Sequence, residues 1–264
     1  MSKKVTLHFN NNEYSFKVLK GSENENAIDV SSLRSESNLI TLDPGFKNTG
    51  SCKSSITFLD GEKGILRYRG YSIEDLAKNA NFLEVAFLLI FGELPTKEEL
   101  DKLVADIQDN AIIDEDLKKI LVSFPRSAHP MGILSSLTSA LIAFNPEKKI
   151  SLTKKTGDGH NYMYTLIVKL LAKIPILVAW VHRRRKGLSL DYGDYTQGYV
   201  ENITKMMFQL PNQAYVKNDV IVNAMNKLLI LHADHEQNCS TSTVRIVGSS
   251  EASLFASVSA GISA

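Results

Sequence analysis

The sequence predicts a mainly α-helical fold that carries a small β unit at its N-terminus. In several short runs before residue 65, apolar and polar residues alternate with the period of half-buried strands. From Ser72 onward, apolar residues recur every three or four positions, behind residues that cap helices. The 264 residues, 44% of them apolar, can bury a sizeable core. We therefore expect a β-rich extension over residues 1–65 and a helical domain over residues 66–264.

The strands are expected in three places. Val5–Phe9 and Tyr14–Val18 predict a hairpin around Asn10-Asn11-Asn12, because Asn tolerates the positive φ of tight turns. LITLDPGF (39–46) and SSITFLDGEKGILRYRG (54–70) repeat the alternation, with Asp43-Pro44-Gly45 and Asp60-Gly61 as turn signals. These runs predict short strands joined by turns.

The helices follow from capping signals and apolar periodicity. Ser72 is a plausible N-cap for IEDLA, Gly92 follows FLEVAFLLIF, and Thr96 with Glu99 forms a capping box. The polar stretch 145–161 lacks periodicity and is expected to be a surface loop. Further helices are expected at about 114–124, 129–144, 161–186, 194–209 and 218–236, and from Ser253.

Charge and cysteine content exclude several classes of protein. Thirty basic and 29 acidic side chains leave a net charge of +1, which argues against nucleic acid or an anionic membrane as a partner. The N-terminus has no continuous apolar run, and the apolar stretch Ile174–Val181 is too short to span a bilayer. Two cysteines, Cys52 and Cys239, are too few for a disulfide framework. We expect a cytoplasmic protein.

Two histidines stand out in the helix expected at 218–236. Steps of four and three from Ile221 lead through Met225 and Leu228 to His232 and His235, so both rings are expected to point inward. They are either core histidines held by hydrogen bonds or part of a pocket for a small carboxylate or keto acid. Metal binding is a third alternative, but the order His-Ala-Asp-His-Glu does not match zinc hydrolases and no third ligand stands nearby. We expect no metal.

The residues that follow the histidines are short and polar. Asn238, Ser240 and the Ser-Thr run after them can line this pocket or cap the next helix, and both roles can hold at once. The basic run 182–186 is expected to close a helix before Gly187 rather than to bind nucleic acid.

The helix that begins at His129 carries small residues and is a candidate interface, within the chain or between subunits. His129 itself is expected to be structural.

Three segments resemble the citrate synthase family, in the bacterial type with an N-terminal β extension. They are LHADHEQNCSTSTVRIVGSS (231–250), DPGFKNTGSCKSSITFLDGEKGILRYRGYSIEDLA (43–77) and HPMGILSSLTSAL (129–141). The resemblance implies the multi-helical large domain of that family. It also implies a Claisen condensation of acetyl-CoA with oxaloacetate, followed by hydrolysis to citrate and CoA, an acyltransferase reaction of the tricarboxylic acid cycle. Acetyl-CoA is a substrate, and no cofactor is expected.

By this resemblance His235 binds oxaloacetate, His232 helps to orient it, and Asn238 and Ser240 match polar residues around the same ligand. Some members bind inhibitory NADH near basic residues that match Lys169 and Lys173. The alternative there is two solvated lysines, because the stretch 109–114 lacks the further basic residues expected.

Members of the family continue beyond SAGISA (259–264) into Trp-Gly-Pro-x-His-Gly-Gly and carry their other catalytic residues further on. These 264 residues do not contain them. We therefore expect no catalytic residue here, an incomplete large domain without the small domain and C-terminal helices, and no activity from this polypeptide alone. A complete protein would be a homodimer or a hexamer. The alternatives are a 2-methylcitrate synthase, which uses propionyl-CoA, and a non-catalytic truncated subunit or ligand-binding remnant.

Overall fold

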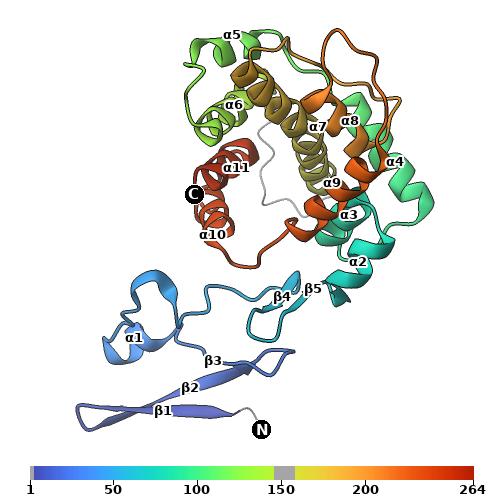
Figure 1. The fold of residues 1–264 in the computed structure, drawn as a ribbon. Helices are drawn as coiled ribbons and strands as arrows, with labels where there is room; N and C mark the ends of the chain where they lie inside the picture. The colour runs from blue at the N-terminus through green and yellow to red at the C-terminus, as the bar shows by residue number, and fades with distance from the viewer. Residues whose placement is uncertain (1–2, 146–157) are drawn as a thin grey trace. The chain divides into compact units, whose positions relative to one another are not determined.

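The computed structural model describes residues 3–145 and 158–264, with side chains in the second range from residue 162 onward. The chain divides into two compact units, Met1–Ser54 and Ser55–Ala264 (Figure 1). The domain boundary expected after residue 65 stays a prediction. Most of the surface loop expected at 145–161 lies outside the described residues.

The first unit contains a small antiparallel sheet in the order β1-β2-β3. Strand β1 (Lys4–Phe9) pairs with β2 (Asn12–Lys20), and β2 pairs with β3 (Asn26–Ile28). Asn10 and Asn11 between β1 and β2 have φ values of 49° and 60°. The predicted hairpin is therefore confirmed, together with its physical reason.

The strand expected at 39–46 is wrong. After helix α1 (Leu33–Ser37), this stretch runs without strand pairing into a single helical turn, η1 (Pro44–Phe46), in which Gly45 has φ 78°. The carboxylate of Asp43 accepts hydrogen bonds from the backbone N–H of Asn48 at 2.8 Å and from Thr49 Oγ1 at 2.6 Å. Such side-chain bonds favour a turn because they satisfy donors that a strand would have to pair elsewhere.

The second unit begins with another antiparallel sheet, formed by β4 (Thr57–Asp60), β5 (Ile65–Tyr68) and β6 (Tyr71–Ser72). Helices α2 (Ile73–Asn79), α3 (Phe82–Phe91) and α4 (Lys97–Asp109) follow. Ser72 caps α2 by accepting from the N–H of Asp75, and Thr96 and Glu99 form a reciprocal capping box. Gly92 ends α3 with φ 100°. The predicted caps are confirmed.

Helix α7 (Asp158–Lys186) lies at the centre of the second unit, where it packs against α4, α6 (Pro130–Phe144) and α8 (Tyr199–Phe208) (Figure 1). Helix α5 (Asp116–Ser123) precedes α6 and packs on it. The inner face of α7 carries Leu177 and Trp180, which are fully buried. By length and composition, the segment Tyr162–Lys186 is long and apolar enough to cross a membrane, and half of its most apolar stretch is buried inside the fold. A central core helix of a soluble protein has the same properties.

A proline lies inside α7. Pro175 has no N–H, so the carbonyl of Leu171, four residues earlier, loses its partner in the helix. The hydroxyl of Tyr199 donates to this carbonyl at 2.8 Å, and the Tyr199 ring stacks on Phe82 at 5.8 Å. A side chain from α8 thus satisfies the group that the proline frees.

The basic run closes α7 as expected, and two of its arginines also bind neighbouring segments. Gly187 has φ 73°. Arg183 is 2% exposed and donates to the carbonyls of Met206 at 3.1 Å and Gln209 at 2.8 Å, and to that of Ser189. Arg184 donates to the carbonyls of Val122 and Phe124. These guanidinium groups hold the ends of α8 and α5 against α7.

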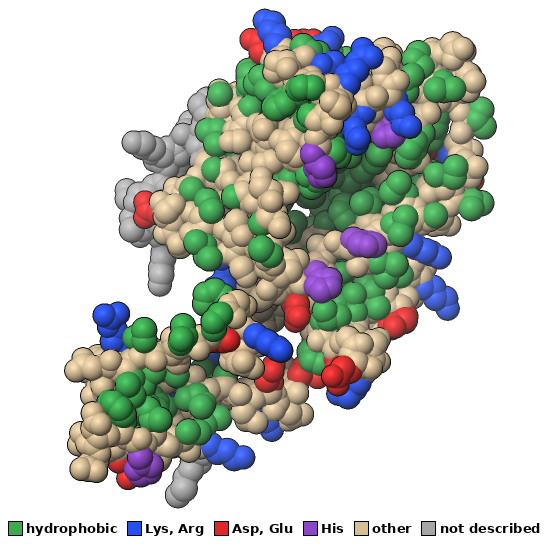
Figure 2. Space-filling view, turned by 60° about the vertical axis from the view of Figure 1, so that its left-hand side comes forward, with side chains coloured by type: hydrophobic (Ala, Val, Ile, Leu, Met, Phe, Trp, Pro, Cys, Tyr) green, Lys and Arg blue, Asp and Glu red, His purple; other side chains and the backbone are tan. Residues whose placement is uncertain are grey.

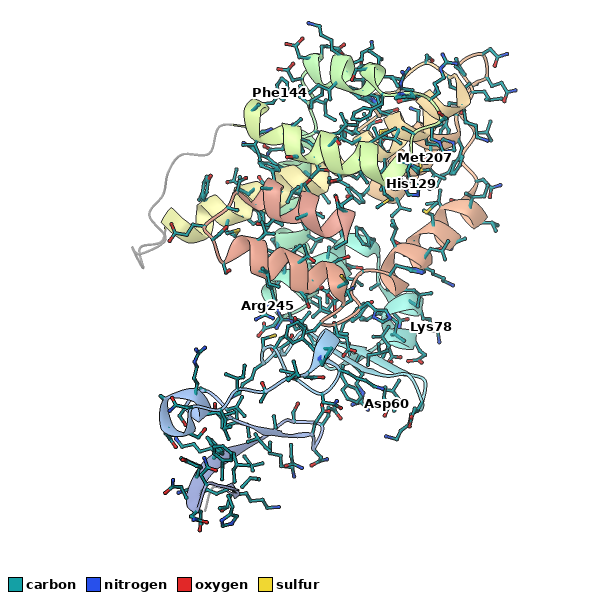
Figure 3. The ribbon with its side chains drawn as sticks, turned by 90° about the vertical axis from the view of Figure 1, so that its left-hand side faces the viewer. Asp60, Lys78, His129, Phe144, Met207 and Arg245 are labelled. Carbon is teal, nitrogen blue, oxygen red and sulfur yellow. The ribbon has the colours of Figure 1, made fainter. Side chains whose placement is uncertain are left out.

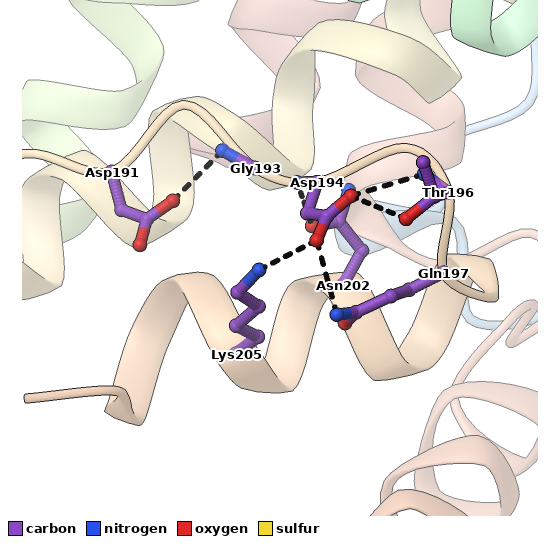
Figure 4. A network of polar contacts seen from close by, with 7 residues as sticks. All are labelled: Asp191, Gly193, Asp194, Thr196, Gln197, Asn202 and Lys205. Carbon is purple, nitrogen blue, oxygen red and sulfur yellow. Dashed lines mark hydrogen bonds and ion pairs between the residues drawn. The ribbon is translucent and has the colours of Figure 1, made fainter. Parts of the chain in front are cut away.

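Helix α8 starts at Tyr199 rather than near residue 194, because Asp194 organises the preceding loop (Figure 4). Its carboxylate accepts from Thr196 N and Oγ1, from Gln197 Nε2 and from Lys205 Nζ at 2.9 Å. The hydrogen bonds from Thr196 and Lys205 lower the pKa of Asp194 to about 2. An ionised side chain with this many donors favours a turn over a helix.

The small residues of α6 make an interface within the chain. His129 and Phe144 lie at the two ends of this helix (Figure 3), and His129 caps it by accepting from the N–H of Met131. Its expected structural role stays a prediction. Ser135 on α6 donates to the carbonyl of Ser259 on α11 (Leu254–Ser263), and Ser259 Oγ donates back to the carbonyl of Ser135 at 2.8 Å. The mainly α-helical fold with a small N-terminal β unit is confirmed.

Candidate functional site

The long helix that was expected to carry both histidines ends before them. Helix α9 spans Asp219–Leu231, with His232 as its C-cap, and a new helix α10 runs over Cys239–Gly248. The prediction of one helix over 218–236 is therefore wrong in its last turn, and α10 was not predicted. His235 lies in the loop 232–238, which we call the HADHEQN loop.

The inward orientation predicted for the histidines is also wrong. His232 and His235 are exposed, and so are Ile221 and Leu228, at 48% and 51%. The buried residue of α9 is instead Ile230, which is fully buried. One turn earlier, the side chain of Asn226 accepts from the N–H of Phe82 at 2.8 Å and donates to the carbonyl of Ala80 at 3.3 Å. The face of α9 that carries Asn226 and Ile230, and not the face of Ile221 and Leu228, therefore lies against the rest of the helical unit.

The ring of His232 is fixed by a backbone contact. Its Nδ1 lies 2.8 Å from the carbonyl oxygen of Leu228. A carbonyl oxygen can only accept, so Nδ1 carries a proton in this contact and Nε2 is the nitrogen left for another partner. Figure 2 shows histidine side chains of the helical unit beside a hollow in its surface.

The HADHEQN loop is held at its start by Tyr68, at the end of β5. The hydroxyl of this fully buried side chain lies 3.2 Å from the carbonyl oxygen of Ile230 and 3.1 Å from that of Asp234, and it accepts from the N–H of Asp234 at 3.2 Å. Burial raises the pKa of this hydroxyl above its usual value, so it stays protonated at neutral pH. The sequence contained this residue within GILRYRG but gave no signal of its partner.

The loop is held at its other end by Asn238. Its side chain caps α10 by accepting from the N–H of Thr241 at 2.8 Å, so the predicted capping role is confirmed. Ser240 follows in the first turn of α10 and is half-buried. Arg245, labelled in Figure 3, donates from Nη1 to Oε1 of Gln237 at 3.1 Å.

Helix α10 then packs closely on α11. A Cβ added to Gly261 would lie 2.6 Å from Cγ2 of Val244 and 3.3 Å from the carbonyl oxygen of Ser240. The two helices therefore approach each other at a position without a side chain, and this contact fixes the helix that carries Ser240.

The two lysines predicted for NADH differ in burial. Lys173 is 7% exposed and its Nζ donates to the carbonyl oxygen of Ile112, whereas Lys169 is half-buried. Burial, and then the charge of Lys169, lower the pKa of Lys173. The alternative of two solvated lysines is therefore wrong for Lys173. Its ammonium group is engaged within the fold, next to the stretch 109–114.

The structure also contains a cavity of about 750 Å³ that the sequence did not indicate. It is lined by α3, α4, α7, α8 and α9, and by none of His232, His235, Asn238 or Ser240. Within residues 3–145 and 158–264, no group of three His, Cys, Asp or Glu side chains is arranged to hold a metal ion. The expectation of no metal stays a prediction.

Chemically, the HADHEQN loop combines two exposed imidazoles with the first turn of a capped helix. Imidazole groups can donate to carboxylate or carbonyl oxygens, and the N-terminal end of a helix favours negative charge. Asp234 lies among these groups, but its Oδ2 is occupied by the N–H of Glu236 at 2.9 Å. The arrangement is suited to a small anion that carries a carbonyl group.

Comparison with known proteins gives a consistent result. The model of the family described as "Citrate synthase, C-terminal domain" matches residues 45–264. Citrate synthase of Corynebacterium glutamicum is 46% identical over 266 residues, which cover 99% of this chain and 58% of that protein. Citrate synthase 1 of Mycobacterium tuberculosis is 42% identical over 260 residues, which cover 98% of this chain and 59% of that protein.

Two solved structures are similar in fold. Citrate synthase from Pyrobaculum aerophilum matches 94% of this chain and 57% of its own, with a TM-score of 0.77 and 29% identity. Citrate synthase from Thermotoga maritima matches 85% of this chain and 55% of its own, with a TM-score of 0.68 and 24% identity, which shows likeness of fold alone. The chain spans less than two thirds of the length of these relatives.

Proposed function

The chain belongs to the citrate synthase family, and from this premise we propose that the HADHEQN loop and the start of α10 form one wall of an oxaloacetate site. His235 binds the ligand, His232 orients it, and Asn238 and Ser240 contribute polar contacts. The observation that carries the proposal is the exposure of both imidazoles in a loop that is fixed at its two ends. A fixed loop holds the imidazoles ready, so binding an anion costs little conformational entropy.

The reaction proposed for the complete enzyme is the condensation of acetyl-CoA with oxaloacetate to a citryl thioester, which water then hydrolyses to citrate and CoA. It needs a group that removes a methyl proton and groups that polarise the thioester and ketone carbonyls, each worth orders of magnitude in rate. The family motif Trp-Gly-Pro-x-His-Gly-Gly is not among these 264 residues. This polypeptide by itself is therefore predicted to release no CoA, and CoA release from oxaloacetate and acetyl-CoA would contradict that prediction.

Calorimetric titration of the 264-residue chain with oxaloacetate tests the site. His235→Ala is expected to weaken oxaloacetate binding by about tenfold or more, since a hydrogen bond to a charged group contributes about 1.5 to 3 kcal/mol. His8→Ala is the matched control, because His8 is also exposed but lies on β1 of the other compact unit. Equal binding by His235→Ala and the wild type would show that His235 is not a ligand residue.

Two alternatives belong to the same site. A 2-methylcitrate synthase would use propionyl-CoA, and the complete enzyme would then turn over propionyl-CoA faster than acetyl-CoA. A non-catalytic remnant would bind oxaloacetate and associate with full-length protomers without any turnover.

For NADH, the engagement of the Lys173 ammonium with the Ile112 carbonyl argues against a direct contact from that residue.

We also propose a cytoplasmic homodimer or hexamer for the complete protein. Exposed apolar side chains on α9 (Val220, Ile221 and Leu228) support association. Light scattering of the chain, alone and mixed with a complete citrate synthase, measures its mass and detects mixed assemblies.

A further inference from the structure

The end of β5 holds Tyr68 in a fixed orientation. The ring belongs to a buried cluster with Ile73, Leu76, Leu88 and Ile230. The next residue, Arg69, has the unusual φ of 50°, and its backbone N–H donates to the carbonyl of Ile56 at 2.7 Å. A non-glycine residue adopts a positive φ of this kind only when its surroundings impose it.

The side chain of Arg69 supplies part of that constraint. Its guanidinium group donates to Oγ of Ser55 at 2.9 Å and to the carbonyl oxygen of Leu89 at 2.9 Å. The turn after β5 is therefore tied to both its own sheet and α3. The phenol of Tyr68 is presented from this rigid base and not from a mobile loop.

Two sets of hydrogen bonds fix the backbone next to His235, and the hydroxyl of Tyr68 makes the first of them. It binds the backbone of Asp234, immediately before His235. The carboxylate of Asp234 then accepts from the N–H of Glu236, immediately after His235, and Glu236 has φ 48°. The backbone on both sides of His235 is thus held, without any contact that needs the imidazole itself.

We propose that Tyr68 is a positioning residue for the oxaloacetate site: through Asp234 it sets the place of the His235 imidazole. This inference rests on the proposed function, in which His235 binds oxaloacetate. A loss of the Tyr68 hydroxyl leaves the N–H of Asp234 without its partner and frees the loop, so the imidazole must be ordered again each time a ligand binds.

The variant that tests the proposal is Tyr68→Phe, which removes one hydroxyl and keeps the ring. Tyr199→Phe is the matched control, because its hydroxyl also donates to a backbone carbonyl, that of Leu171, but lies away from the HADHEQN loop. Asp234→Ala removes only the second set of hydrogen bonds and provides an independent variant in case Tyr68→Phe folds poorly. Each variant of the 264-residue chain is measured by hydrogen exchange with mass spectrometry and by calorimetric titration with oxaloacetate.

Tyr68→Phe is expected to speed exchange of residues 232–238 about tenfold and to weaken oxaloacetate binding about tenfold, which corresponds to about 1.4 kcal/mol. Asp234→Ala is expected to speed exchange near residue 236 and to weaken oxaloacetate binding in the same direction. Tyr199→Phe is expected to lower stability while it leaves both quantities unchanged. A merely structural role for Tyr68 would make the two tyrosine variants behave alike.

The outcomes separate this inference from the proposed function. Unchanged hydrogen exchange of residues 232–238 in Tyr68→Phe would show that the Tyr68 hydroxyl does not hold the HADHEQN loop, whatever happens to oxaloacetate binding. Faster exchange with unchanged oxaloacetate affinity, in a chain whose binding requires His235, would overturn the positioning role. If the wild-type chain binds no oxaloacetate, the proposed function fails and the positioning role fails with it, while the exchange data still decide whether Tyr68 holds the loop.

Discussion

The close approach of α10 and α11 makes a sharp prediction for Gly261→Ala. The new Cβ would lie 2.6 Å from Cγ2 of Val244, about 1 Å closer than carbon atoms at their optimal separation. Val244 cannot easily turn away, since a valine in a helix strongly prefers one rotamer. The helices must therefore separate, which costs about 1 to 3 kcal/mol for an overpacked core.

A second effect acts in the opposite direction. Alanine is favoured over glycine inside a helix by about 1 kcal/mol. The net expectation for Gly261→Ala is a loss of up to about 2 kcal/mol in the free energy of unfolding. Gly132→Ala in α6 is the matched control, because nothing lies within 4 Å of its added Cβ, and it is expected to stabilise the chain.

Urea unfolding followed by fluorescence measures both changes. Trp180 is the single tryptophan of the sequence and is fully buried in the same compact unit as both glycines. In a Val244→Ala background the cost of Gly261→Ala should disappear, because the clashing methyl group is gone. The reasoning is refuted if Gly261→Ala is as stabilising as Gly132→Ala, or if its cost is the same with and without Val244.

Three further predictions concern the polar contacts of α7 and α8. Because the pKa of Asp194 falls from its usual 3.8 to about 2 in the folded chain, its contribution to stability is present above pH 4 and lost as the pH falls toward 2. Asp194→Asn should thus lower the urea midpoint more at pH 7 than at pH 2, while Asp101→Asn, an exposed carboxylate, changes neither. Arg183→Lys should cost about 2 to 4 kcal/mol in urea unfolding, because one ammonium group cannot reach three carbonyls, and Arg185→Lys should cost almost nothing. Tyr199→Phe should cost about 1 to 3 kcal/mol by the same measurement, since it leaves the carbonyl of Leu171 unpaired, and an unchanged stability would contradict this.

Local chemistry was predictable from the sequence at one hairpin turn and at several helix caps, where a few neighbouring residues decide the conformation. The turn at Asn10-Asn11 and the caps at Ser72, Thr96 and Gly92 are all of this kind. In each, a side chain satisfies a backbone group within three residues, or tolerates a φ that others do not. No information from distant parts of the chain was needed.

Two predictions for the region of the proposed site failed because they depended on distant contacts. The apolar residues of α9 occur on several of its faces. Periodicity predicted that the face of Ile221 and Leu228 is buried, whereas the face that carries Ile230 and the contacts of Asn226 with the start of α3 is the inner one. Helix α10 was missed because Ser, Thr and Val disfavour isolated helices. The packing of α10 on α11 at Gly261 supplies the stabilisation that the helix propensity of its own residues does not. The residues of the proposed site were singled out from the residue pattern and given their roles by resemblance, but the exposure of His232 and His235 was not foreseen.

The hydrogen bond between Tyr199 and the Leu171 carbonyl determines in which order Pro175 and Tyr199 can be replaced without a loss of stability. While Pro175 is present, that carbonyl depends on the phenol, so Tyr199→Phe is costly. Once Pro175→Ala restores an N–H four residues on, the same carbonyl regains a partner inside its own helix and the phenol becomes dispensable. A lineage that lost the proline first could then discard the tyrosine freely, but one that lost the tyrosine first would have to survive a less stable protein.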